Sequence, residues 1–179
     1  MAHSRIFQLT DEYLFKGGNA DDIINETDFY EIGSFLGPVA DSVSDECDRK
    51  EDFDDLVEFL AKAVGHDPKN NDLLAWHFSS EDSETAEAYI TFKPGYRKEY
   101  FNKRYELFQA FVAQTTPDVF MGDDNNFSLW LLKQAFGDMF GFYVWLGEGY
   151  VVMLDDFLRR LPNDQEATYW LGGTVNYRY

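Results

Sequence analysis

Apolar residues between positions 53 and 64 recur at the spacing of an α-helix, and this pattern constrains the fold more than any other feature of the chain. The apolar positions are Phe53, Leu56, Val57, Leu60, Ala61 and Val64. The opposite face of the same helix carries Asp54, Asp55, Glu58 and Lys62. A helix with one apolar face and one charged face packs against a second layer of structure. Gly65 follows, and a glycine at this place predicts the end of the helix.

Strand patterns occur in pairs around this helix. We expect strands at 5–10, 73–79, 88–93, 142–146, 150–154 and 168–179, the last interrupted at Gly172-Gly173. The strongest hairpin signal is the Gly147-Glu148-Gly149 turn between two apolar runs. Further helices are expected at 97–113, at 128–136 and from Asp155 to just before Pro162, and a short one at Ile23-Ile24, capped by Asp21-Asp22.

Paired strands around helices, without a regular strand–helix alternation, predict an α+β fold. The sheet is expected to be antiparallel or mixed, with the helices packed mainly on one face. A chain of 179 residues suits a single domain over residues 1–179. Its 18% aromatic content excludes a disordered acidic chain, which would be poor in aromatic residues.

The negative charge is concentrated in the first half of the sequence. The net charge is −18, and residues 1–92 hold 22 acidic and 6 basic side chains. Residues 93–179 are nearly neutral, with 11 acidic and 9 basic side chains, and they are rich in aromatic residues. This distribution argues against direct binding of nucleic acid or an anionic membrane. It permits a basic partner protein.

The densest acidic segment runs from residue 41 to residue 58. Its carboxylates are the candidate partner-binding residues: Asp41, Asp45, Glu46, Asp48, Glu51, Asp52, Asp54, Asp55 and Glu58. On a helix, residues three or four apart lie about 5–6 Å from each other. Asp41, Asp45, Asp48 and Asp52 have this spacing, and so do Glu51, Asp54, Asp55 and Glu58. An ordered row of this kind can imitate the phosphates of a nucleic acid strand.

A solvated acidic face is the alternative interpretation. Two unit charges 6 Å apart in water repel by only about 0.7 kcal/mol, and by less in salt. A folded protein tolerates this repulsion without any functional reward.

A second charged segment, Lys93 to Tyr105, interleaves five basic residues with aromatic ones. Such a segment can hold phosphates and stack bases. In a molecule this acidic, we instead expect its cations to pair with the protein's own carboxylates.

The sequence predicts no catalytic residue, no metal site and no cofactor. His3, His66 and His77 lack metal-ligand spacing, and the loops 70–72 and 123–126 lack the pattern of a calcium-binding loop. Cys47 is the only cysteine and is surrounded by acids, which disfavour its thiolate. One thiol cannot form an internal disulfide, and no apolar run approaches the ~20 residues that cross a bilayer. A cytoplasmic location is therefore expected.

These observations favour a non-enzymatic binding protein whose acidic half occupies the basic surface of another protein. A nucleic-acid mimic that inhibits a nuclease or a nucleic-acid-binding protein fits this chemistry. One alternative is an interaction module with a merely solvated acidic face, and another is a carboxylate-based enzyme whose site is invisible in the sequence. The tyrosine-rich C-terminal strand, ending at Tyr179, also allows a homodimer contact.

Overall fold

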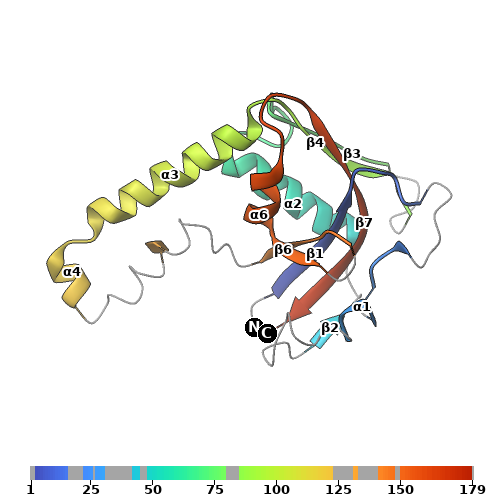
Figure 1. Ribbon diagram of the computed structural model, residues 1–179, viewed down its shortest axis with the longest axis horizontal. Coiled ribbons are helices and arrows are strands. Elements are labelled where there is room, and N and C mark those ends of the chain that lie inside the picture. Colours follow the sequence, from blue (N-terminus) through green and yellow to red (C-terminus); the bar gives the residue numbers. More distant parts are fainter. Residues whose placement is uncertain are drawn as a thin grey trace.

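A computed structural model covers the chain and describes residues 3–15, 22–25, 27–30, 42–44, 48–79, 85–122, 131–132, 141–147 and 150–178. Within these ranges a mixed sheet forms the centre of the fold (Figure 1). Its strands are β1 (His3–Thr10), β2 (Ser42–Ser44), β3 (Leu74–Phe78), β4 (Ala88–Phe92), β5 (Phe142–Trp145), β6 (Val151–Met153) and β7 (Ala167–Arg178).

The strand order is β3-β4-β7-β1-β5-β6, and β2 also pairs with β7. β1 and β5 pair in parallel, whereas the other pairings are antiparallel. The expected hairpin is confirmed, since β5 and β6 pair in antiparallel fashion from Tyr143–Met153 to Trp145–Val151. The first and second halves of the sequence both contribute strands to this one sheet. The acidic and the nearly neutral half are therefore not separate structural units.

The described helices are α1 (Thr27–Tyr30), α2 (Arg49–Ala63), α3 (Tyr96–Gln114), α4 (Pro117–Met121) and α6 (Leu154–Arg160). Figure 1 shows α2 and α6 lying against one face of the sheet, with the start of α3 beside them. The main core lies between this face and these helices. The predicted α+β architecture, with helices mainly on one face, is confirmed. A smaller cluster, in which Ile24 and Phe29 pack with Ile6, Trp145 and Val175, forms a second core.

The apolar stripe of α2 explains its position. Phe53, Leu56, Val57 and Leu60 are at most 2% exposed. Burying a side chain of this size contributes about 1.5–3 kcal/mol. The helix ends at Ala63, and Gly65 follows as predicted, with a φ of +78° that is readily adopted only by glycine.

β7 runs without a break through Gly172-Gly173, where an interruption was expected, but its pairing with β1 shifts register at these glycines, between Phe7–Thr174 and Leu9–Leu171. The glycines allow close approach of other groups to the strand. A Cβ at Gly172 would lie 2.3 Å from Gln8 Oε1, and one at Gly173 would lie 2.4 Å from the Ile24 carbonyl oxygen. The side chain of Gln8 uses this space to accept hydrogen bonds from the N–H groups of Ile24 and Gly173.

The short helix expected at Ile23-Ile24 is also wrong, since the described helix in this region begins at Thr27. Gln8 again supplies the reason. Its amide donates to the carbonyl of Asp22 at 2.6 Å, and its oxygen accepts from the N–H of Ile24 at 3.1 Å. These bonds tie the backbone around Ile23 to β1. The expected helix at 128–136 lies outside the described residues, except for positions 131 and 132.

Candidate functional site

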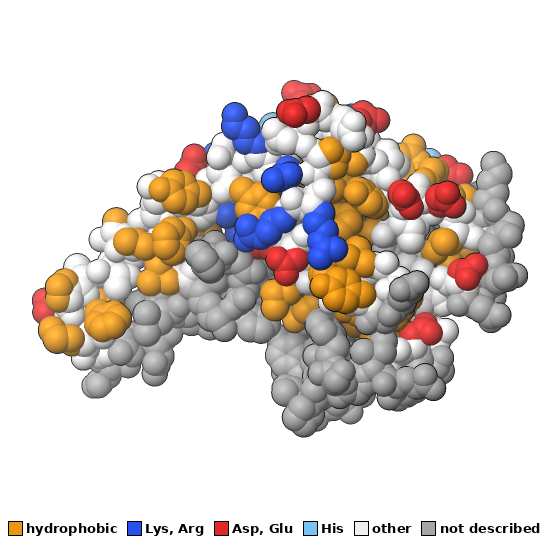
Figure 2. All heavy atoms as spheres, in the orientation of Figure 1, with side chains coloured by type: hydrophobic (Ala, Val, Ile, Leu, Met, Phe, Trp, Pro, Cys, Tyr) orange, Lys and Arg blue, Asp and Glu red, His pale blue; other side chains and the backbone are white. Residues whose placement is uncertain are grey.

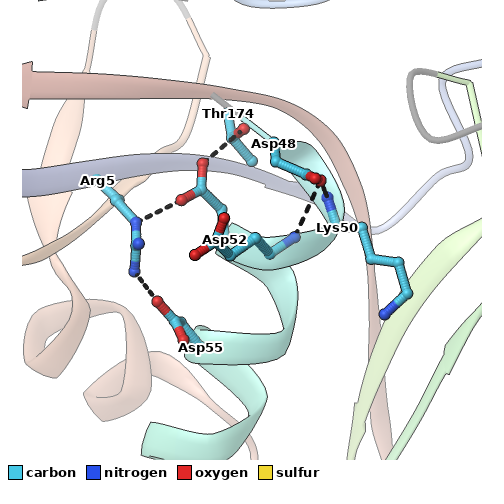
Figure 3. A network of polar contacts seen from close by, with 7 residues as sticks. Arg5, Asp48, Lys50, Asp52, Asp55 and Thr174 are labelled. Carbon is cyan, nitrogen blue, oxygen red and sulfur yellow. Dashed lines mark hydrogen bonds and ion pairs between the residues drawn. The ribbon is translucent and has the colours of Figure 1, made fainter. Parts of the chain in front are cut away.

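The acidic segment is organised around the first turn of α2 (Figure 3). Asp48 is the N-cap of the helix, and its carboxylate accepts hydrogen bonds from the N–H groups of Lys50 at 2.9 Å and Glu51 at 3.2 Å. An aspartate at this position accepts hydrogen bonds from backbone N–H groups that the helix leaves unpaired. The helix dipole also stabilises its negative charge. Asp48 therefore has a structural role at the start of α2.

Asp52 lies inside the protein and not on its surface. The residue is 3% exposed, pairs with Arg5 of β1, and accepts a hydrogen bond from the Thr174 hydroxyl of β7 at 3.3 Å. Figure 3 shows Arg5 reaching both Asp52 and Asp55. This arrangement corrects the expectation that Asp52 contacts a partner, because a buried and paired carboxylate is not accessible. Arg5 and Asp52 instead join β1 to α2.

The two expected rows of carboxylates differ in outcome. Asp41, Asp45, Asp48 and Asp52 do not form one helical row, because 42–44 is a strand and the helix begins only after Asp48. Asp41, Asp45 and Glu46 themselves lie outside the described residues. The second row does lie on α2, and we call its members, Glu51, Asp54, Asp55 and Glu58, the acidic face.

The acidic face is partly neutralised by nearby cations. Lys50 pairs with Asp54 at 2.5 Å and Lys62 pairs with Glu58, each one helical turn away. Asp55 pairs with Arg5, whereas Glu51 has no ion pair among the described residues. Exposed pairs of this kind contribute only about 0–1 kcal/mol, so the cations of a partner can displace them.

Arg49, the remaining cation of the acidic segment, is buried at 7% exposure. Its guanidinium donates to the carbonyl oxygens of Ala86, Leu171 and Gly172 at 2.8–2.9 Å. It also stacks on the rings of Phe15 and Phe78. Arg49 thus supplies donors to backbone carbonyls of β7 in the stretch between its pairings with β4 and β2. Sequence reasoning missed this role because the contacts of Arg49 with β7 span more than 120 positions.

The basic segment from Lys93 to Tyr105 divides into two groups. Lys93 pairs with Glu166, Lys103 lies 3.5 Å from Glu106 and 3.8 Å from Glu99, and Arg104 lies 3.3 Å from Asp155. For these three residues the expected pairing with the protein's own carboxylates is confirmed. Arg97 and Lys98 behave differently, since neither has a carboxylate partner in the described part of the chain.

A buried polar cluster joins α3 to α6. The hydroxyl of Tyr100 donates to Asp155, which is 2% exposed, and Tyr96 donates to the carbonyl of Leu60 at 2.9 Å. Burial raises the pKa of Tyr100, and the charge of Asp155 and their hydrogen bond raise it further. Burial also raises the pKa of Tyr96, with smaller contributions from Tyr100 and Asp155. These tyrosines keep their protons and act as hydrogen-bond donors from α3, Tyr100 to α6 and Tyr96 to α2.

The position of His77 follows the alternation of side chains along β3. Trp76 and Phe78 contact Phe53 in the core, whereas His77 stacks on Tyr89, as their alternation along β3 predicts. Among the described residues, no three His, Cys, Asp or Glu side chains are grouped closely enough to hold a metal ion. The loop 123–126 and Cys47 lie outside these residues. In the loop 70–72, Asn71 accepts hydrogen bonds from the N–H groups of Leu73 and Leu74, as expected of a turn.

Two pockets on the described surface have volumes of about 460 and 400 Å³. Neither is lined by a carboxylate, so neither has the paired acids that a carboxylate-based enzyme would use. No helix in the described ranges is both long and apolar enough to cross a bilayer. Comparison of the chain with protein-family models, with curated proteins and with solved structures found no match.

Proposed function

We propose that this chain is a non-enzymatic acidic binding protein whose acidic face docks on the basic surface of a partner protein. The observation that carries the proposal is the placement of Glu51, Asp54, Asp55 and Glu58 on one helix, whose opposite side is buried against the sheet. A fixed helix presents its carboxylates to a partner with little loss of conformational entropy. The partner class that we propose is a nucleic-acid-binding protein, because its binding surface carries suitable cations.

The neighbouring cations limit how strong this interaction can be. Among the described residues, Glu51 is the member of the acidic face that has no cation close by. Asp54, Asp55 and Glu58 each have one. Binding must therefore exchange these intramolecular pairs for pairs with the partner. The expected result is fast association that weakens as salt is added, with modest affinity from the described carboxylates.

The test is a pull-down from cell extract with immobilised protein at low and high salt. A triple variant, Glu51→Gln, Asp54→Asn and Glu58→Gln, removes three charges from the acidic face. Asp48 and Asp52 are left unchanged, because substituting the cap or the buried pair would destabilise the fold. The matched control, Glu12→Gln, Glu106→Gln and Glu166→Gln, removes the same charge from exposed positions elsewhere.

The proposal requires that the captured proteins are basic, that duplex DNA displaces them, and that the triple variant loses them while the control retains them. If both variants retain the captured proteins equally well, the acidic face is not the binding surface. Equal loss would show a general effect of net charge and would also contradict the proposal.

A second candidate function, an interaction module that does not use the acidic face, is favoured by exposed apolar side chains on the other long helix and on α4. Leu107, Phe120 and Met121 are 43%, 57% and 75% exposed. Exposed apolar groups of this size are typical of protein contacts. Partners held in this way would resist both salt and DNA, which separates the two functions in the same pull-down.

A further inference from the structure

A pocket of about 460 Å³ lies between the first turns of α3 and the end of α6. We call it the basic pocket, and its lining residues are Arg97, Lys98, Phe101, Asn102, Arg159 and Asn163. Three of these six residues are cations and none is an acid, although acids outnumber bases 33 to 15 in the whole chain. Figure 2 shows Lys and Arg side chains gathered near the middle of the face on which the start of α3 and α6 lie.

Two of the three cations of the basic pocket, Arg97 and Lys98, have no ion pair among the described residues. Arg97 donates from Nη1 to the carbonyl of Leu161 at 2.9 Å, which orients its guanidinium and leaves further N–H donors. Lys98 is exposed and has no carboxylate partner in the described ranges. Arg159 lies 4.7 Å from the ring centroid of Phe101 and only loosely contacts Asp156, at 3.7 Å.

The position of two of these cations adds positive potential. Arg97 and Lys98 lie in the first turn of α3, where the helix dipole disfavours cations. The N-cap of α3 is Gly95, which provides no side-chain acceptor for the first N–H groups. An anion in the basic pocket would neutralise the two side chains and so offset their unfavourable interaction with the helix dipole.

The frame of the basic pocket is held in place before any ligand arrives. The N–H of Gly95 donates to the carbonyl of Asn163 at 2.9 Å, and the Tyr100 hydroxyl donates to Asp155 of α6. Arg104 adds a 3.3 Å contact to the same carboxylate. A preformed site loses little entropy on binding, so a few polar contacts give measurable affinity.

We propose that the basic pocket binds a small phosphate monoester. Two guanidinium groups match the oxygen geometry of a phosphate, and Lys98 and the Asn102 amide add further donors. The volume exceeds that of a phosphate group alone and leaves space for an organic portion, which can stack on the exposed guanidinium of Arg159. A pocket of about 460 Å³ is of the size that encloses a small molecule, so the proposed ligand is a soluble small molecule.

Isothermal titration calorimetry at low salt with phenyl phosphate, inorganic phosphate and phenol tests this proposal. Phenyl phosphate is expected to bind more tightly than inorganic phosphate, and phenol is expected not to bind. Lys98→Gln and Arg159→Gln, both at exposed positions, are each expected to weaken the binding of phenyl phosphate at least about tenfold. The control Lys103→Gln removes the same charge from α3 outside the pocket, and it is expected to weaken binding less than about twofold.

The proposal is overturned if phenyl phosphate shows no saturable binding up to about 10 mM. It is also overturned if Lys103→Gln weakens binding as much as Lys98→Gln, because the effect would then be one of overall charge. Near-ultraviolet circular dichroism of each variant verifies that the fold is intact. The test uses neither the acidic face nor a partner protein, so its outcome is independent of the proposed function.

Discussion

The two long helices, α2 and α3, differ both in how their apolar residues are distributed and in their surroundings: those of α2 gather on one face, whereas those of α3 are spread around the helix. In α2 the apolar positions are buried, and Leu60 is fully inaccessible. In α3 only Tyr96 and Tyr100, in the first two turns, are buried. Farther along α3, Tyr105 and Val112 are 59% and 48% exposed. Burial therefore follows both the one-sided distribution of apolar residues along a helix and the presence of a second layer against that side.

Figure 1 shows the reason for the difference. α2 runs across the sheet along its length, whereas α3 leaves the sheet after its first turns and carries α4 at its far end. The contacts of α3 with the rest of the described protein are therefore concentrated at its start. The hydroxyl groups of Tyr96 and Tyr100 and the guanidinium groups of Arg97 and Arg104 all bond to other elements there.

The largest effect is expected from truncating the buried stripe of α2. Leu60→Ala removes a fully buried side chain from the main core and should lower the free energy of unfolding by about 2–5 kcal/mol. Urea denaturation followed by circular dichroism measures the change. A loss below about 1 kcal/mol would mean that α2 does not form the core described here, and the comparison with α3 would fail.

An intermediate effect is expected at the anchored start of α3. Tyr100→Phe removes the donor to buried Asp155 and should cost about 1.5–3 kcal/mol at neutral pH. Urea denaturation again measures the cost. A change below about 0.5 kcal/mol would show that this hydrogen bond does not anchor α3.

The same substitution should also change the response to alkali. Because the pKa of Tyr100 is raised in the folded state, first by burial and then by Asp155, the folded protein keeps this proton when the unfolded chain loses it. The associated stability is present below the unfolded pKa, about 10, and is lost as pH rises above it. Tyr100→Phe should reduce the fall in unfolding free energy between about pH 9.5 and 11. An unchanged slope would contradict the assignment.

The sequence predicts the local parts of this fold well, for a physical reason. The helix at α2 and the β5–β6 hairpin depend on residues close together in the chain, and their spacing carries the information. The extent of β7 agrees with the expected strand at 168–179, but the role of its two glycines depends on Gln8 and Ile24, which are about 150 positions away. Glycine is a turn signal when it stands alone, but here it provides room for side chains and backbone from other segments.

The charged residues show the same limit more strongly. Asp52 and Asp54 are neighbours in one acidic run, yet Asp52 is buried with Arg5 and Asp54 faces solvent with Lys50. The helical repeat places Asp52 and Asp54 on different faces of α2. The repeat alone does not reveal that Arg5 of β1 pairs with the buried Asp52. The basic pocket was likewise hidden, since Arg97 and Arg159 are far apart in the sequence.

The smallest effect is expected on the projecting part of α3 and completes the comparison with Leu60→Ala. Leu107→Ala makes the same chemical change at a side chain that is 43% exposed. Little apolar area returns to water, and alanine is at least as good a helix former as leucine, so the free energy of unfolding should change by no more than about 0.5 kcal/mol. The same urea titration measures it, at two protein concentrations.

A loss above about 1 kcal/mol would mean that Leu107 packs against another part of the folded chain, and α3 would then be stabilised along its length as α2 is. A loss that grows with protein concentration would instead mean that α3 is covered by a second copy, since self-association stabilises the folded state by mass action. Only a small change that is independent of concentration leaves α2 as a core helix and α3 as a helix anchored at its start.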